Sequence, residues 1–185
     1  MPQGNSQRSE PRPAFRSRGF GGSIIVAGVV LENVLLLVRH GRAEEDHPLG
    51  DSARGLLSSG RDAFRAHAGR VAERVGIMGV VTSPLVRAVQ TGEILAGALG
   101  TNEVAVRAEL APAMGLRDGM ALARELGAGY ALVGHNPAMG ALLARLIDRD
   151  GAASFAPGAI AALVPSRADR PWKLLWCVAP GEALP

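Results

Sequence analysis

Three apolar runs that end in polar residues constrain the fold of this chain more than any other feature. The first run, residues 34–37, leads into the stretch Arg-His-Gly at 39–41, as a strand leads into its carboxyl end. The second run ends at Thr-Ser and the third at Gly-His, and in each case a proline typical of a helix start follows (84 and 137). Ligands of open α/β sheets bind outside the carboxyl ends of the strands, so we expect the three stretches to meet at one site.

Helical patterns separate the predicted strands. Apolar residues at helical spacing follow the first strand (Phe64, Ala68, Val71), and Ser83 with Pro84 are expected to begin a helix that runs to about residue 99. Further helices are predicted near 118–126 and from 137, and further strands at 79–82, 104–107, 130–134, 159–164 and 172–178, the last two at a sheet edge. This alternation predicts an α/β fold, a three-layer α/β/α sandwich with a mostly parallel central sheet.

With 185 residues the chain is long enough for one domain with a full core. Residues 1–32 are predicted to be a mobile N-terminal extension and residues 33–185 the folded domain, because residues 1–22 are rich in Pro, Gly, Ser and Arg. The apolar run 23–31 leaves three interpretations of the extension open: a tail, a targeting signal or an incorrectly early start.

Charge and cysteine content limit the partners and the compartment that we expect. Four arginines and one glutamate in residues 1–31 account for the net charge of +3, so the remainder of the chain is neutral and gives no reason to expect nucleic acid. No run is long enough to span a membrane. Cys177 is the only cysteine, which agrees with a reducing compartment, and we expect a cytoplasmic monomer.

Two arginines and two histidines are predicted to converge where the strands end. The planar guanidinium groups of Arg39 and Arg87 suit the oxygens of a phosphate, and a neutral imidazole of His40 or His135 could attack its phosphorus. Such a site needs neither metal nor cofactor. Each motif alone is more often a hydrogen-bonded surface feature or a helix cap, and only their agreement in position and chemistry favours a catalytic site.

These three motifs resemble the signatures of the histidine phosphatase superfamily, the phosphoglycerate-mutase-like fold. The resemblance runs in order from about Val34 to Val178, through Arg-His-Gly at 39–41, Ser-Pro-Leu-Val-Arg-Ala-Val-Gln-Thr at 83–91 and Val-Gly-His-Asn-Pro at 133–137. The stretches 54–56, 60–61 and 159–161 are most similar to the small phosphohistidine phosphatases. Gly55 stands where that branch usually has proline, and Leu57 where it usually has a Ser or Thr cap.

The resemblance implies that His40 is phosphorylated transiently and that Arg39, Arg87 and His135 form the phosphate pocket. Neighbouring residues that we expect to contact phosphate are Gly41, Ser83 and Asn136. The general acid has several candidates: mutase-like relatives carry a glutamate in the loop after the second motif, where Glu109 fits best. Glu44 or Asp46 could instead reach in from the first loop, and a surface role for all three remains an equal alternative.

The sequence therefore predicts a phosphatase that removes phosphate from phosphohistidine in a protein such as a signalling phosphotransfer domain. Two alternatives remain open: a phosphatase of small phosphoesters with the same fold, and a non-catalytic module that only recognises phosphate. The predicted loops include no long insertion that could close over a small substrate, which favours an open crevice and a protein substrate.

Overall fold

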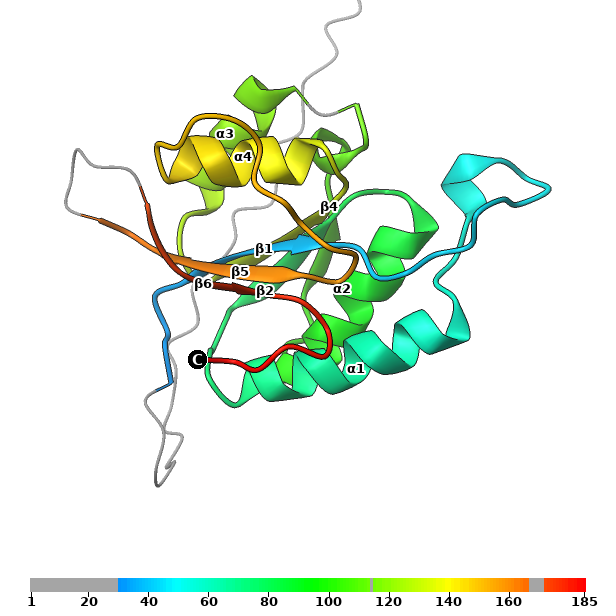
Figure 1. Ribbon diagram of the computed structural model, residues 1–185, viewed down its shortest axis with the longest axis horizontal. Coiled ribbons are helices and arrows are strands. Elements are labelled where there is room, and N and C mark those ends of the chain that lie inside the picture. The colour runs from blue at the N-terminus through cyan, green and yellow to red at the C-terminus, as the bar shows by residue number, and fades with distance from the viewer. Residues whose placement is uncertain (1–29, 114, 167–171) are drawn as a thin grey trace, which may run out of the picture.

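A central sheet of six strands is covered by helices on both faces (Figure 1). The computed structural model describes residues 30–113, 115–166 and 172–185. The strands are β1 (Leu35–Arg39), β2 (Gly79–Thr82), β3 (Val104–Val106), β4 (Tyr130–Gly134), β5 (Ile160–Val164) and β6 (Lys173–Val178). The helices are α1 (Ser58–Ala72), α2 (Val86–Leu99), α3 (Leu116–Leu126) and α4 (Ala138–Leu146), with short 3-10 turns η1 (Asp51–Ala53) and η2 (Ala108–Leu110).

The strand order is β3-β2-β4-β1-β5-β6. β3, β2, β4 and β1 run parallel to one another, whereas β5 is antiparallel to both of its neighbours. Arg39 is level with Gly134, and Thr82 with Val133, so β1, β4 and β2 end side by side. The predicted α/β/α sandwich with a mostly parallel sheet is therefore confirmed, and its last two strands lie at one edge.

Alternate residues of β1 supply the two halves of the core. Leu36 and Val38 pack toward α1 and α2, and Leu35 and Leu37 pack toward α3 and α4, all with no exposed surface. A parallel strand covered on both faces is apolar at every position. This explains why β1 appears in the sequence as a continuous apolar run rather than an alternating one.

The start of α2 differs from the prediction. α2 begins at Val86 and not at Pro84, because Leu85 is still extended and serves as the N-cap residue. The hydroxyl of Ser83 accepts a weak hydrogen bond from the Leu85 N–H (3.3 Å) but is also bonded to His135, 2.7 Å away. Ser83 therefore belongs to the strand-end site rather than to the helix cap.

The start of α1 has a backbone contact in place of a side-chain cap. Leu57 is its N-cap residue and makes no capping bond, but its N–H donates to the Arg42 carbonyl (3.0 Å). Gly60 permits this approach, since a Cβ there would collide with the same carbonyl. The first helical turn is thus fixed against the loop that follows β1.

The buried face of α2 is wide. Thr91 and Leu95 are fully buried, and Val89 and Leu99 are half-buried. The helix packs against both β2 and α1, so more than one side of it is buried. Arg87 is among its buried residues.

The predicted mobile extension falls mainly on residues 1–29, which lie outside the described residues. Within the described part, Leu31 exchanges backbone hydrogen bonds with Arg74 (2.9 Å) and Gly76 (3.0 Å). Contacts with the domain therefore begin slightly before the expected boundary at residue 33. No helix among the described residues is long and apolar enough to cross a membrane.

Candidate active site

The ends of three neighbouring strands bring the two histidines together. His40 follows β1 and His135 follows β4, and their ring centroids are 5.0 Å apart. The His40 N–H donates to the Gly134 carbonyl (3.1 Å) and the Ser83 N–H to the Val133 carbonyl (3.0 Å). These bonds extend the parallel pairing beyond the strands, so the backbone of the site is held as firmly as the sheet.

The His40 ring is fixed with one nitrogen toward its own loop. Its Nδ1 lies 2.8 Å from the Gly41 carbonyl, and since a carbonyl only accepts, Nδ1 carries the proton. In the neutral ring Nε2 then keeps its lone pair. Burial, followed by the charges of Arg87, Arg39 and Arg54, lowers the pKa of His40 to about 4, so the imidazole is neutral at physiological pH.

His135 is more deeply buried than His40. Its Nε2 lies 2.7 Å from the Ser83 hydroxyl, and the residue is only 3% exposed. Burial lowers its pKa to about 3, and the nearby His40 and Arg87 act in the same direction. Its buried Nδ1 has no hydrogen-bond partner within the described part of the chain.

Arg39 is held by a loop far away in the sequence. Its Nη1 donates to the Phe155 carbonyl (2.7 Å), and the Asn136 Nδ2 donates to the same oxygen (3.0 Å). Burial lowers the pKa of Arg39, and its buried Nε has no partner among the described residues. The loop before β5 therefore orients two of the predicted phosphate ligands, a contribution that the sequence did not reveal.

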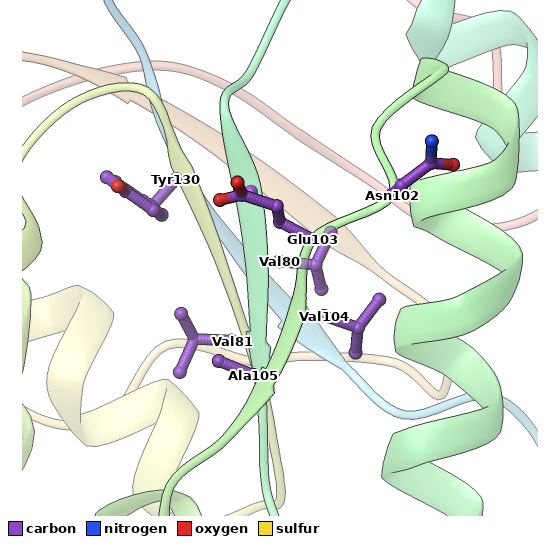
Figure 2. A pocket seen from close by; sticks show the side chains of 8 residues that line it. Val80, Val81, Asn102, Glu103, Val104, Ala105 and Tyr130 are labelled. Carbon is purple, nitrogen blue, oxygen red and sulfur yellow. The ribbon is translucent and has the colours of Figure 1, made fainter. Parts of the chain in front are cut away.

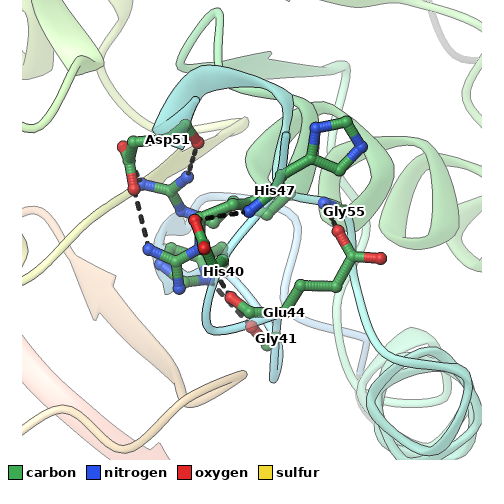
Figure 3. A network of polar contacts seen from close by, with 9 residues as sticks. His40, Gly41, Glu44, His47, Asp51 and Gly55 are labelled. Carbon is green, nitrogen blue, oxygen red and sulfur yellow. Dashed lines mark hydrogen bonds and ion pairs between the residues drawn. The ribbon is translucent and has the colours of Figure 1, made fainter. Parts of the chain in front are cut away.

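Arg87 is held by the loop that follows β1, and Figure 3 shows this network. Its Nη1 donates to the Asp51 backbone carbonyl (2.7 Å), and its Nη2 pairs with the Asp51 carboxylate (3.0 Å). That carboxylate also pairs with Arg54 (2.7 Å), whose Nε donates to the Glu44 carbonyl (2.6 Å). The hydrogen bonds from Arg87 and Arg54 hold the pKa of Asp51 below its usual value, so Asp51 is ionised.

Sequence reasoning missed Asp51 and Arg54 as members of the site. Both lie in the loop that follows β1, and their spacing of three residues is the one signal in the sequence that could have paired them. Their partner Arg87 lies 36 residues from Asp51 in the sequence.

Gly41 takes part in the site through both backbone groups. Its carbonyl accepts from His40, and its N–H donates to the Thr91 hydroxyl (3.1 Å), which in turn donates to the Arg87 carbonyl (2.7 Å). Thr91 thereby links the loop that follows β1 to α2. The phosphate contacts expected of Gly41, Ser83 and Asn136 stay predictions, and in this structure each of these residues has a partner within the protein.

Glu109, the first candidate for general acid, lies on η2 beside Arg107. The Arg107 guanidinium contacts the Glu109 carboxylate at 2.7 Å and the Glu125 carboxylate at 2.9 Å. These two carboxylates raise the pKa of Arg107 further. The role of Glu109 as proton donor stays a prediction.

The two other candidate acids face backbone groups of the first loop. The Glu44 carboxylate accepts the Gly55 N–H (2.8 Å), and the Asp46 carboxylate accepts the His47 N–H (2.8 Å). Both contacts stabilise the loop, as local carboxylate caps do.

A separate hollow of about 230 Å³ lies at the opposite end of the strands. Val80, Val104 and Tyr130 line it, and Glu103 borders it (Figure 2). Tyr130 and Gly79 are the first residues of β4 and β2, so this hollow is at their amino ends, far from the histidines. No group of three or more His, Cys, Asp and Glu side chains suited to a metal occurs within the described residues.

Comparison with known proteins agrees with the family resemblance of the three sequence motifs. The model of the histidine phosphatase superfamily (branch 1) matches residues 35–122, a segment that contains Arg39, His40 and Arg87. No curated protein sequence matches the chain at a significant level. Over these residues the chain is similar to the histidine phosphatase superfamily, whose members are phosphatases.

Solved structures resemble the domain over most of its length. The protein histidine phosphatase SixA complexed with tungstate is 29% identical, with a TM-score of 0.70 over 80% of this chain and 97% of that one. A phosphohistidine phosphatase SixA from Nakamurella multipartitia is 25% identical, with a TM-score of 0.65 over 81% and 97%. A mycobacterial glucosyl-3-phosphoglycerate phosphatase complexed with VO3 is 19% identical, with a TM-score of 0.63 over 80% and 99%, and shows the shared fold alone.

Proposed function

We propose that this protein is a metal-independent phosphatase that removes phosphate from phosphohistidine in a protein and forms a transient phosphohistidine at His40. The observation that carries the proposal is the state of His40. Its Nδ1 is bonded to the Gly41 carbonyl and its pKa is about 4, so a neutral imidazole presents Nε2 as a nucleophile.

In the first step the Nε2 of His40 attacks the phosphorus. A bond forms between Nε2 and phosphorus while the bond between phosphorus and the substrate imidazole breaks. That imidazole, protonated beforehand on its other ring nitrogen, leaves as a neutral ring, and phosphorylated His40 carries a positive charge with its proton on Nδ1. Arg39 and Arg87 stabilise the charge on the phosphoryl oxygens, and His135 contributes a further contact. The buried Nε of Arg39 and Nδ1 of His135, which lack partners within the described residues, favour a site built to receive an anion.

In the second step water attacks the phosphorus of phosphorylated His40. The bond between Nε2 and phosphorus breaks, both protons of the water leave with the phosphate as dihydrogen phosphate, and His40 returns to its neutral form with its proton still on Nδ1. The reaction as a whole consumes one water and yields free histidine and phosphate. A weak general acid suffices, because imidazole as a leaving group needs less protonation than an alkoxide.

Two observations favour a protein substrate over a small ester. The SixA structure, whose name states that it is a protein histidine phosphatase, shares 29% of its residues with this chain. The described loops around the site, of which 40–57 is the longest, also hold no inserted α-helix or strand that could close over a small molecule.

The test compares a phosphohistidine-bearing phosphotransfer domain with a panel of small phosphate esters. We expect a higher kcat/KM on the phosphohistidine protein, no effect of EDTA, and competition by tungstate or vanadate. Inactivity of the His40→Ala variant is the control. Higher specificity constants on a small ester would instead support a small-molecule phosphatase.

Trapping the intermediate tests catalysis itself. Rapid acid-free quenching and mass spectrometry should detect phosphate on His40 during turnover of the wild-type protein. Binding of tungstate without turnover of any substrate and without phosphorylated His40 would support a module that only recognises phosphate.

A further inference from the structure

A groove of about 390 Å³ opens directly beside the candidate phosphate pocket. It lies between the first turns of α1, the loop before β5 and the segment after β6. Its walls are mostly small and apolar, with Ala63 and Phe64 on one side and Ala156 and Pro157 on the other. Gly41, the neighbour of His40, belongs to both the groove and the pocket.

Hydrogen bonds to the catalytic loop hold both walls of the groove in place. The Gly158 N–H donates to the His40 carbonyl (2.9 Å), which fixes the wall at Ala156 and Pro157. The Leu57 N–H donates to the Arg42 carbonyl (3.0 Å), which fixes α1 on the other side. The groove is therefore part of the same rigid assembly as His40, and a group bound in it would have a defined position relative to the nucleophile.

The polar end of the groove is positively charged. Arg42 lines it, and the exposed guanidinium makes no hydrogen bond or ion pair with any described residue. Ser59 and Gly60 come from the first turn of α1, which contains no acidic residue. The positive end of the helix dipole thus adds to the charge of Arg42, and together they complement a carboxylate.

We propose that this groove binds the residues that flank the phosphohistidine of a protein substrate. An acidic side chain of the substrate pairs with Arg42, and an aliphatic side chain packs against the exposed Ala63 and Pro157. This inference rests on the proposed function and adds to it a preference for acidic and aliphatic flanking residues. Its support is the continuity of the groove with the phosphate pocket and the charge of the end nearest His40.

Two synthetic phosphohistidine peptides test the charge preference. They are identical, with leucines around the phosphohistidine, except that the residues two positions to either side are Glu in one and Lys in the other. We expect the wild-type protein to show roughly threefold to tenfold higher kcat/KM on the Glu peptide, mainly through KM, as expected for a partly exposed charge pair. Equal values for the two peptides would contradict the proposal.

Two variants locate the preference in the groove. Arg42→Glu should reverse the ratio between the peptides, whereas a general change of charge near His40 would alter both values together. Arg124→Glu, an equal change of charge in the exposed last turn of α3, is the matched control and should keep the wild-type ratio. A reversal in both variants, or in neither, would overturn the assignment to Arg42.

Filling the groove tests its apolar part. Ala63 is an exposed residue on the wall, so Ala63→Trp should fold normally and lower kcat/KM on the leucine-flanked Glu peptide severalfold relative to a glycine-flanked one. An unchanged ratio would exclude apolar binding there. If the wild-type protein hydrolyses esters but neither peptide, the proposed function itself fails; hydrolysis of both peptides without preference refutes only the groove.

Discussion

The two sides of the phosphate pocket hold their polar groups in different ways. On the side formed by β1 and β4, His40 and His135 are bonded to groups next to the strand ends, and the backbone there continues the pairing of the sheet. On the other side, Arg87 is held by Asp51, whose carboxylate side chain is 58% exposed on a loop. A rigid sheet edge positions the proposed nucleophile His40, whereas an exposed ion pair positions Arg87, one of the two arginines proposed to bind phosphate.

The two sides therefore differ in how firmly they hold His40 and Arg87. The proposed attack on phosphorus would require His40 to be placed within a few tenths of an ångström, and the sheet supplies that order. Phosphate binding by Arg87, as proposed, would compete with a carboxylate that water also reaches, so this contact would be weaker and easier to exchange. The following predictions test this difference, from the largest expected effect to the smallest.

His40→Ala should lower turnover by at least about 10³-fold, because the nucleophile is lost, while the melting temperature changes little. Steady-state kinetics and thermal unfolding monitored by circular dichroism measure the two effects. Turnover above a few per cent of the wild-type rate would remove His40 from this role.

Glu109→Gln should slow hydrolysis of an alkyl phosphate by roughly 10²–10⁴-fold if Glu109 is the proton donor. An ester with an activated leaving group and phosphohistidine should be much less affected, because neither depends on protonation by a carboxyl group. If the variant hydrolyses all three substrates at wild-type rates, Glu109 is not the general acid, and Glu44 and Asp46 are the remaining candidates. Equal large losses on all three would instead mean that Glu109 organises the pocket.

The stability of the fold should fall as the pH decreases from about 6.5 toward about 4. The folded-state pKa values of His40 and His135 lie below the usual 6.5, so in this range the unfolded chain binds protons that the folded protein excludes. The free energy of unfolding is therefore at its full value above pH 6.5, and it decreases as the pH falls toward the folded-state pKa values of the two histidines. Thermal unfolding across this range checks it, and His40→Asn should flatten the curve; an unchanged curve would argue against a neutral His40.

Asp51→Asn should have the smallest effect, about twofold to fivefold tighter inhibition by tungstate, since Arg87 no longer shares its charge with a carboxylate. Inhibition constants at low and high salt measure it. Asp62→Asn, which removes a similar exposed carboxylate from its pair with Arg65, is the control. Weaker inhibition would show that Asp51 mainly orients Arg87.

The parts of the fold that the sequence predicted depend on local pattern. β1 and β4 each form a short apolar run that ends in a chemically distinctive residue, and a buried parallel strand can hardly appear otherwise. The helix starts were less accurate. The sequence cannot show that the Ser83 hydroxyl contacts His135 across the site instead of capping α2.

The candidate site divides in the same way. Residue type and strand ends were enough to predict that Arg39, His40, Arg87 and His135 meet, because the carboxyl ends of parallel strands share one edge of a sheet. The partners that orient them were beyond the sequence: Thr91 lies 50 residues from Gly41, and Phe155 lies 116 residues from Arg39.

Two of those missed partners act through backbone carbonyls, those of Phe155 toward Arg39 and of Asp51 toward Arg87. Every residue carries a carbonyl, so no side-chain pattern in the sequence marks the one that is used. The sequence was thus enough to predict which side chains form the candidate site. The folded chain alone decides their orientation, their neutral or charged state and the groove beside them, because each of these depends on contacts between distant segments.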